Sequence, residues 1–420
     1  MSSATVLASD VDPATLDFIT PEKYERDGYP HPEWTWLRRH DPVHWTEHAF
    51  SDPFWAVTKH ADIVAIGKNP TDWIIEPRIA VLNREAPPEP TSRHLLTMDP
   101  PDHGRYRNLI SKWFTPRTVK VWEPKVQQVT REVLDLAAEK AGEKGEIDFV
   151  ADVSAPITIA VIALMLGVPE KDWPLLFRWT NEIIAPDDPE FQRGRTALET
   201  NENARIELFT YFKQLAEKRR ADPIDDILSV IVQARIDGKP LADFELLSYY
   251  FLLVVAGNET TRNAMTGGIQ CFLDNPDEWQ RLAANPGLVE GAIEETVRWT
   301  TPVIQFCRTA TRDMELRGKQ IRKGQQVCLF YASGNRDEEI FEDPFRFRID
   351  RNPNDHIGFG RGEHVCLGAH LARLEIRSMY SQLRTRLVSM ERTGPVVRVR
   401  SSFVGGIKRA PMRWQLRKAT

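Results

Sequence analysis

A mostly apolar stretch within Ala242–Leu273 predicts a long helix. Its mostly apolar run, Leu246–Ala256, is followed by the polar segment Gly257–Thr261. At about 1.5 Å per residue a continuous helix of this length extends for roughly 48 Å. Polar side chains inside a core helix cost free energy unless they are hydrogen-bonded or used. The Gly257–Thr261 side chains are therefore either hydrogen-bonded within the helical bundle or used in chemistry.

The remaining pattern predicts a mainly α protein with a smaller β region. Most segments between 117 and 235 alternate apolar stripes with charged faces, as bundle helices do. A proline-rich loop is expected over residues 74–98, and β structure after residue 301, with a late hairpin turning at Gly405-Gly406. Other predicted elements are a helix around Trp34–Arg39, a strand at Trp55–Val57, and helices at His60–Gly67, Val126–Ala137 and Asn203–Lys218.

Composition narrows the class of protein. No repeat, low-complexity block or Gly/Ser linker interrupts the 420 residues, so we expect a single domain over residues 1–420 with a loose segment at 1–20. The net charge of −5 argues against a general nucleic-acid binder. No signal-peptide pattern and no run of about 20 apolar residues occur, so we expect a cytoplasmic protein without a membrane anchor.

Four cysteines lack the Cys-x-x-Cys spacing of a zinc site, and disulfides are not expected in a cytoplasmic protein. The last of them, Cys366, lies in the segment FGRGEHVCLG, which starts at Phe359. Gly358, Gly360 and Gly362 alternate before it and predict a tight irregular loop. A helix is predicted over Leu367–Tyr380, with Leu371, Leu374 and Met379 on its apolar stripe.

This arrangement places Cys366 just before a helix start, where unpaired amides and the helix dipole stabilise a thiolate. A thiolate is a soft ligand for iron. A phosphate-binding G-x-G-x-x-G loop does not fit, because Glu363 stands at its third glycine. A buried structural cysteine is the simpler alternative.

The pattern Phe-Gly-x-Gly-x-His-x-Cys-x-Gly, followed by AHLARLE at 369–375, resembles the heme-binding loop of the cytochrome P-450 monooxygenases. The resemblance implies the fold of that family, with the long helix over heme b and the cysteine loop beneath it. It makes Cys366 the axial iron ligand, and thiolate ligation favours O–O cleavage.

The resemblance also assigns the residues that hold the heme. By the family pattern Phe359 shields the sulfur, and Gly368 closes the loop. His103, Arg107, Arg308 and His364 meet the propionates, and Ala256 lies against the porphyrin. His103 and Arg107 are four residues apart on one predicted helical face, where without the family they would be interpreted as a solvated pair.

Within the central helix, AGNETT resembles the oxygen-activation groove of the family. On that match Thr260 hydrogen-bonds dioxygen and Glu259 belongs to a proton relay. A Glu and a Thr that are simply satisfied within a helical bundle would be the alternative.

A third motif is Glu-x-x-Arg, filled here by Glu295 and Arg298. Its family partner is an arginine eight residues before Phe359, which is Arg351. The resemblance implies a structural network that fixes the cysteine loop. An exposed helical ion pair is the alternative interpretation.

Apolar residues expected around the substrate imply a hydrophobic substrate. The candidates are Leu95, Leu96, Val254, Ala256, Val303, Ile304, Phe403 and Val404. The segments AGNETTRNA, SGNRDEEIFEDPF and RNPNDHIGFG are most similar to bacterial hydroxylases of steroid side chains, methyl-branched lipids and terpenoids, so hydroxylation at a terminal methyl is the first expectation.

No flavin or iron–sulfur segment is present, so the resemblance implies electrons from a ferredoxin with its reductase. The expected docking face carries Arg105, Lys112, Arg117, Lys120 and Arg361. Three alternatives stay open: a hydroxylase specific for terpene alcohols, a peroxide-driven heme enzyme and a non-catalytic heme sensor.

Overall fold

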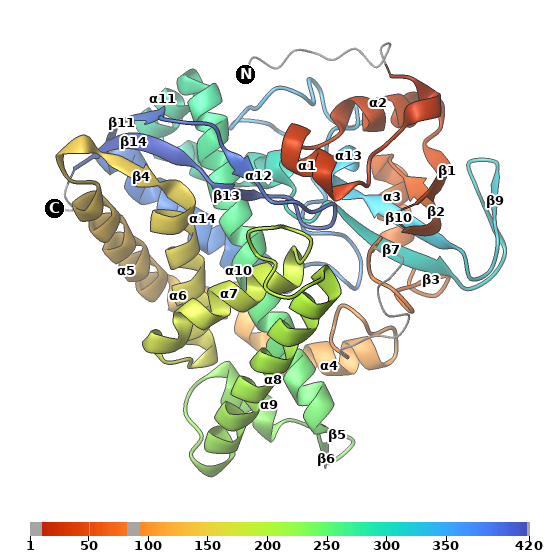
Figure 1. Ribbon diagram of the computed structural model, residues 1–420, viewed down its shortest axis with the longest axis horizontal. Helices are drawn as coiled ribbons and strands as arrows, with labels where there is room; N and C mark the ends of the chain where they lie inside the picture. Colours follow the sequence, from red (N-terminus) through yellow and green to blue (C-terminus); the bar gives the residue numbers. More distant parts are fainter. Residues whose placement is uncertain (1–10, 50, 82–92, 418–420) are drawn as a thin grey trace.

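A computed structural model describes residues 11–49, 51–81 and 93–417. Helices fill most of the molecule, with the five-stranded sheet on the right of the view and the sheet of β4, β11 and β14 at the upper left (Figure 1). The helices are α1 (Pro21–Asp27), α2 (His31–His40), α3 (His60–Gly67), α4 (Asp102–Ile110), α5 (Pro116–Ala141), α6 (Ala155–Leu166), α7 (Trp173–Ile184), α8 (Ala197–Ala221), α9 (Ile227–Gln233), α10 (Asp243–Asp274), α11 (Pro276–Ala284), α12 (Val289–Thr300), α13 (Tyr331–Gly334) and α14 (Ala369–Arg386).

The largest sheet has the order β1-β2-β10-β7-β3. Strands β2 and β10 pair in parallel although they are far apart in the chain, while β7 pairs with β10 in antiparallel fashion. Smaller sheets join β11, β14 and β4, and β12 with β13. The strands are β1 (Val43–His48), β2 (Ser51–Val57), β3 (Trp73–Ile74), β4 (Glu146–Asp148), β5 (Arg235–Ile236), β6 (Lys239–Pro240), β7 (Gln305–Ala310), β8 (Met314–Leu316), β9 (Lys319–Ile321), β10 (Gln326–Phe330), β11 (Leu387–Arg392), β12 (Val397–Arg398), β13 (Ile407–Arg409) and β14 (Pro411–Leu416).

Helix α10 runs through the helical part and contacts α6, α7, α8, α12 and α14 (Figure 1). Its N-terminal half packs into one hydrophobic cluster with α5–α9, and its C-terminal half into another with α12 and α14. The predicted helix Ala242–Leu273 is confirmed within one residue at each end. No described helix has both the length and the apolarity to cross a membrane.

Of the segment 1–20 that was predicted to be loose, residues 1–10 lie outside the described residues. Near its other end Phe18 and Ile19 are 1% and 2% exposed and Phe18 packs edge-on against Phe330, so the segment is anchored there. One prediction about local structure needs correction. The late hairpin does not turn at Gly405-Gly406, since β12 and β13 are joined by the whole segment 399–406.

The two glycines serve close packing instead of turning the chain. A Cβ at Gly405 would lie 2.4 Å from the Tyr29 ring, and one at Gly406 would lie 2.1 Å from Asn263. The prediction of one domain over residues 1–420 stays a prediction.

Candidate active site

The cysteine loop has the irregular backbone that its glycines predict. Gly360 and Gly362 have φ of +71° and +81°, a region that L side chains resist. A Cβ at Gly362 would also lie 2.0 Å from the carbonyl oxygen of Gly67 on α3. The amide of Cys366 donates to the carbonyl of Phe359 at 2.8 Å, which folds the loop back on itself three residues before α14.

Cys366 lies deep in the protein, yet its side chain is accessible. Burial raises the pKa of its thiol, while the Gly368 amide, Arg107 and Arg373 act in the opposite direction. Ala256 is likewise exposed although it stands in the middle of the core helix α10. An accessible residue at such depth lines an internal cavity, so α10 and the cysteine loop contribute walls to interior space.

Basic side chains beside the loop fit a dianionic ligand. Buried Arg308 and half-buried Arg107 form no ion pair with any described carboxylate. The rings of His103 and His364 lie 4.0 Å apart, and within the described residues His103 Nε2 and both nitrogens of His364 lack hydrogen-bond partners. Burial lowers the pKa of His103 to about 4 and that of His364 to about 2, so both are neutral at pH 7.

Two arginines and unpaired imidazole groups match the two carboxylates of a heme, because buried charges need partners and carboxylates accept such donors. With Cys366 as a thiolate, the donor set fits a heme with an axial sulfur. Heme b supplies oxygen activation when bound, and the loop orients its sulfur ligand.

Two neighbouring residues in the polar segment of α10, Glu259 and Thr260, have different surroundings. Thr260 is partly exposed, and its hydroxyl donates to the carbonyl of Ala256 at 3.0 Å. Glu259 is buried and pairs with Arg262, whose Nη1 donates to Asn181 Oδ1 on α7 at 3.2 Å. Burial raises the pKa of Glu259 even though Arg262 opposes it. The contact of Arg262 with Asn181 is not visible in the sequence, because Asn181 is remote in the chain.

The Glu-x-x-Arg network is buried and complete. Arg298 donates from Nε and Nη2 to the two oxygens of Glu295, both at 2.8 Å. Arg351 Nε lies 3.1 Å from Glu295 Oε2. The same carboxylate accepts from the Arg348 amide and from Asn354, which lies in the segment leading to Phe359. The exposed helical pair considered from the sequence is therefore excluded.

The predicted substrate residues come from four segments. Residues 302–304 and 403–405 are joined by a bridge between Val303 and Val404 and by the Ile304 amide, which donates to the Phe403 carbonyl at 2.9 Å. Leu96, Ala256, Val303 and Phe403 retain accessible surface, whereas Leu95, Val254, Ile304 and Val404 are buried in packing. Their roles toward a substrate stay predictions.

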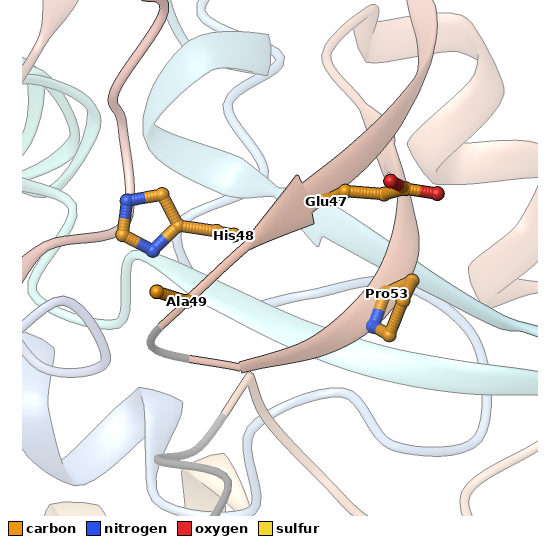
Figure 2. Close-up of a pocket in the computed structure, with 4 residues that line it drawn as sticks. All are labelled: Glu47, His48, Ala49 and Pro53. Atoms are coloured by element: carbon orange, nitrogen blue, oxygen red, sulfur yellow. The ribbon is translucent and has the colours of Figure 1, made fainter.

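Figure 2 shows a different feature, an open hollow of about 410 Å³ on the β1–β2 hairpin, lined by Glu47, His48, Ala49 and Pro53. It contains none of the predicted site residues. Figure 1 places this hairpin at the sheet edge of the molecule, apart from α14. We assign it no part of the site.

Comparison with known proteins agrees with the fold. Residues 30–386 match the family model described as Cytochrome P450. The chain belongs to the cytochrome P450 family, and it is a P450 monooxygenase with heme b as cofactor.

Several named members of the family are similar to this chain over nearly its whole length. A steroid C26-monooxygenase of Mycolicibacterium smegmatis is 38% identical, with 96% of this chain and 94% of the relative covered. A methyl-branched lipid omega-hydroxylase of Mycobacterium tuberculosis is 34% identical, with 97% and 95% covered. A solved Mycobacterium marinum cytochrome P450 in complex with pseudoionone superposes with a TM-score of 0.88 at 34% identity, covering 96% of this chain and all of that one.

Proposed function

We propose that this monooxygenase hydroxylates an unactivated C–H bond of a hydrophobic molecule such as a steroid side chain, a methyl-branched lipid or a terpenoid. The observation that carries the proposal is that Ala256, in the middle of α10, and Cys366 both keep accessible surface although they lie deep in the protein. The expected apolar lining of the cavity, including Leu96, Val303 and Phe403, favours a hydrophobic substrate. The named relatives act on molecules of this kind, and a terminal methyl is the first position to examine.

A titration of the heme-loaded protein tests the substrate class. Sterols, branched fatty acids and pseudoionone are added, and the spin-state shift of the Soret band is measured. A saturable shift with one class, followed by turnover and identification of the hydroxylated carbon, supports the proposal. A shift only with short, charged compounds contradicts it.

We infer that Thr260 and Glu259 handle protons in the reaction. Thr260 lies on the cavity side of α10, and Glu259 is the adjacent acid held by Arg262. Thr260→Ala is expected to keep its heme but to form about tenfold less product per electron pair, with hydrogen peroxide released instead. Thr261→Ala, at the neighbouring buried position, serves as the control. Unchanged coupling in Thr260→Ala would refute the assignment.

We also infer that electrons come from an acidic ferredoxin that docks beside α14. Lys112, Arg117 and Lys120 are exposed at the start of α5 and the turn before it, which both contact α14. Arg105 and Arg361 are less available, because they pair with Asp237 and Asp355. Lys112, Arg117 and Lys120 therefore supply most of the positive charge that is free to attract a ferredoxin.

The docking face is tested by the rate of reduction. The triple variant Lys112→Glu, Arg117→Glu, Lys120→Glu should be reduced more slowly by ferredoxin, and the wild-type rate should fall with added salt. Reversal of Arg195 and Lys239, outside this face, is the matched control. A rate independent of both charge and salt would remove this docking face. Product formed with peroxide but not with ferredoxin would favour the peroxide-driven alternative, and no product at all would favour a sensor.

A further inference from the structure

The ring of Phe359 is covered by a positive charge. The Arg373 guanidinium carbon lies 4.4 Å from the ring centroid, within the range of a cation–π contact. The carbonyl of the same Phe359 accepts the amide of Cys366 at 2.8 Å. Arg373 on α14 is thus coupled through one aromatic residue to the backbone that holds the sulfur.

Arg373 is fixed in place by Glu294 of α12. Its Nε and Nη2 donate to the two oxygens of Glu294 at 2.6 and 2.8 Å, a bidentate geometry that restricts the plane of the guanidinium. Glu294 also accepts from His356 Nε2 at 2.9 Å. The Gly358 amide donates to His356 Nδ1 at 3.2 Å, so the proton of this imidazole is on Nε2. We call Glu294, His356 and Arg373 the Phe359 clamp.

The clamp is not needed to join its two helices. One turn further along, Arg377 binds Glu290 through Nε and Nη2 at 2.5 and 2.7 Å, again between α14 and α12. Among the described residues Arg377 contacts no aromatic ring, whereas Arg373 covers the ring of Phe359. Two ion pairs of the same type therefore differ in one respect, their contact with the cysteine loop.

We propose that Arg373, oriented by Glu294, is a positioning residue that sets the charge and the ring position next to the Cys366 thiolate, and through them the reduction potential of the heme-thiolate centre. The inference rests on heme-thiolate ligation by Cys366. A positive charge near the centre favours the added electron and a negative charge disfavours it. Groups beyond the direct ligands tune metal sites in this way.

Substitution of Arg373 and substitution of Glu294 should consequently shift the reduction potential in opposite directions. Arg373→Met removes the positive charge and is expected to shift the ferric–ferrous potential to lower values. Glu294→Gln leaves the positive charge uncompensated and is expected to shift the potential upward. A purely structural pair would loosen the loop in the same way in both variants.

The experiment is a spectroelectrochemical titration of the heme-loaded protein without substrate, with the iron–sulfur stretching band recorded in parallel. Arg377→Met and Glu290→Gln are the matched controls, and each should give the wild-type potential. Shifts of the same sign in Arg373→Met and Glu294→Gln, or shifts no larger than in the controls, would overturn the proposal.

If Arg373→Met fails to load heme, Arg373→Lys takes its place. Lysine keeps the charge but loses the planar fork, so its potential should lie near wild type while the iron–sulfur band moves. A potential below wild type in Arg373→Lys, or an unmoved band, would count against the proposal. If the wild type itself lacks thiolate spectra, heme-thiolate ligation has failed, which is a distinct result from a thiolate protein insensitive to Arg373.

Discussion

Accessibility and depth together distinguish Cys366 from the other cysteines. Cys271, Cys307 and Cys328 are buried, and burial raises the pKa of the Cys271 and Cys328 thiols. Cys366 instead faces interior space, with an amide and two arginines that favour its thiolate. The family motif identifies this residue, and the surrounding charges explain how it acts as a ligand.

Cys366→Ser is expected to lose the thiolate signature. A serine oxygen is a harder and less basic donor than a thiolate here, so the red-shifted Soret band of the reduced carbonyl complex should disappear. The absorption spectrum checks this directly. Cys271→Ser, at a buried position away from the loop, should keep the band, and retention of the band in Cys366→Ser would exclude this cysteine as the ligand.

At the scale of elements, helix α12 presents two adjacent carboxylates to different partners. Glu295 holds Arg298 and Arg351, while Glu294 holds Arg373 and His356. The first set fixes the segment before the cysteine loop, and the second covers the loop itself. Consecutive residues of α12 thereby hold both the cysteine loop and the segment before it.

Arg298→Ala should yield little heme-loaded protein. It leaves Glu295 buried with one cation fewer, and breaking a buried pair costs about 3–5 kcal/mol. Heme content per protein after purification is the measurement. Arg281→Ala, which removes a partly exposed arginine paired with Glu278, is the control. Normal heme content in Arg298→Ala would contradict a role in fixing the loop.

Glu294 should make stability depend on acid pH. Burial opposes its ionisation, but hydrogen bonds from Arg373 and His356 outweigh burial and hold its pKa at about 2. Because the folded pKa is lowered, the carboxylate contributes stability above about pH 4.5, and this contribution falls as the pH drops toward 2. Glu294→Gln should therefore lose about 2 kcal/mol at pH 7 and much less near pH 2.

Urea unfolding of both proteins over this pH range measures the difference. Glu290→Gln, more exposed, should differ from wild type by less than Glu294→Gln at every pH. A constant difference between Glu294→Gln and wild type from pH 7 to pH 2 would contradict the lowered pKa.

At the scale of the whole molecule, a charged cluster joins the N-terminal, middle and C-terminal parts. Asp188, between α7 and α8, is buried and accepts Lys408 Nζ of β13 at 2.7 and 2.8 Å. It also accepts the amide of Arg400, whose guanidinium reaches Glu25 of α1 at 2.7 Å. The segment 185–196 is thus held to the same strands that flank Phe403.

Asp188→Asn should destabilise the protein by about 1.5–3 kcal/mol, because the Lys408 ammonium loses its nearest carboxylate and keeps only Glu25 and Glu190 at 3.6 Å. The double variant Asp188→Asn, Lys408→Met should recover part of that loss. Thermal or urea unfolding of the singles and the double gives the coupling. Strictly additive losses would show that the two residues do not depend on each other.

The local sequence pattern was sufficient to predict helix α10 and the irregular loop before Cys366. The apolar run and its polar interruption gave helix α10, and the glycine spacing gave a loop at Gly360 and Gly362 whose φ values are positive. These predictions succeed because periodicity and backbone sterics act over a few residues. The family resemblance added heme, the axial ligand and the Glu295–Arg298–Arg351 set.

Contacts between remote segments were decided only by the tertiary structure. The sequence shows Glu294, His356 and Arg373 as unrelated polar residues, and only packing of α12 against α14 brings them around Phe359. The same holds for Arg262 with Asn181 and for Asp188 with Lys408. The positions of charged residues in the sequence do not tell which remote residue will pair with a given buried charge. That pairing depends on how the helices and strands pack.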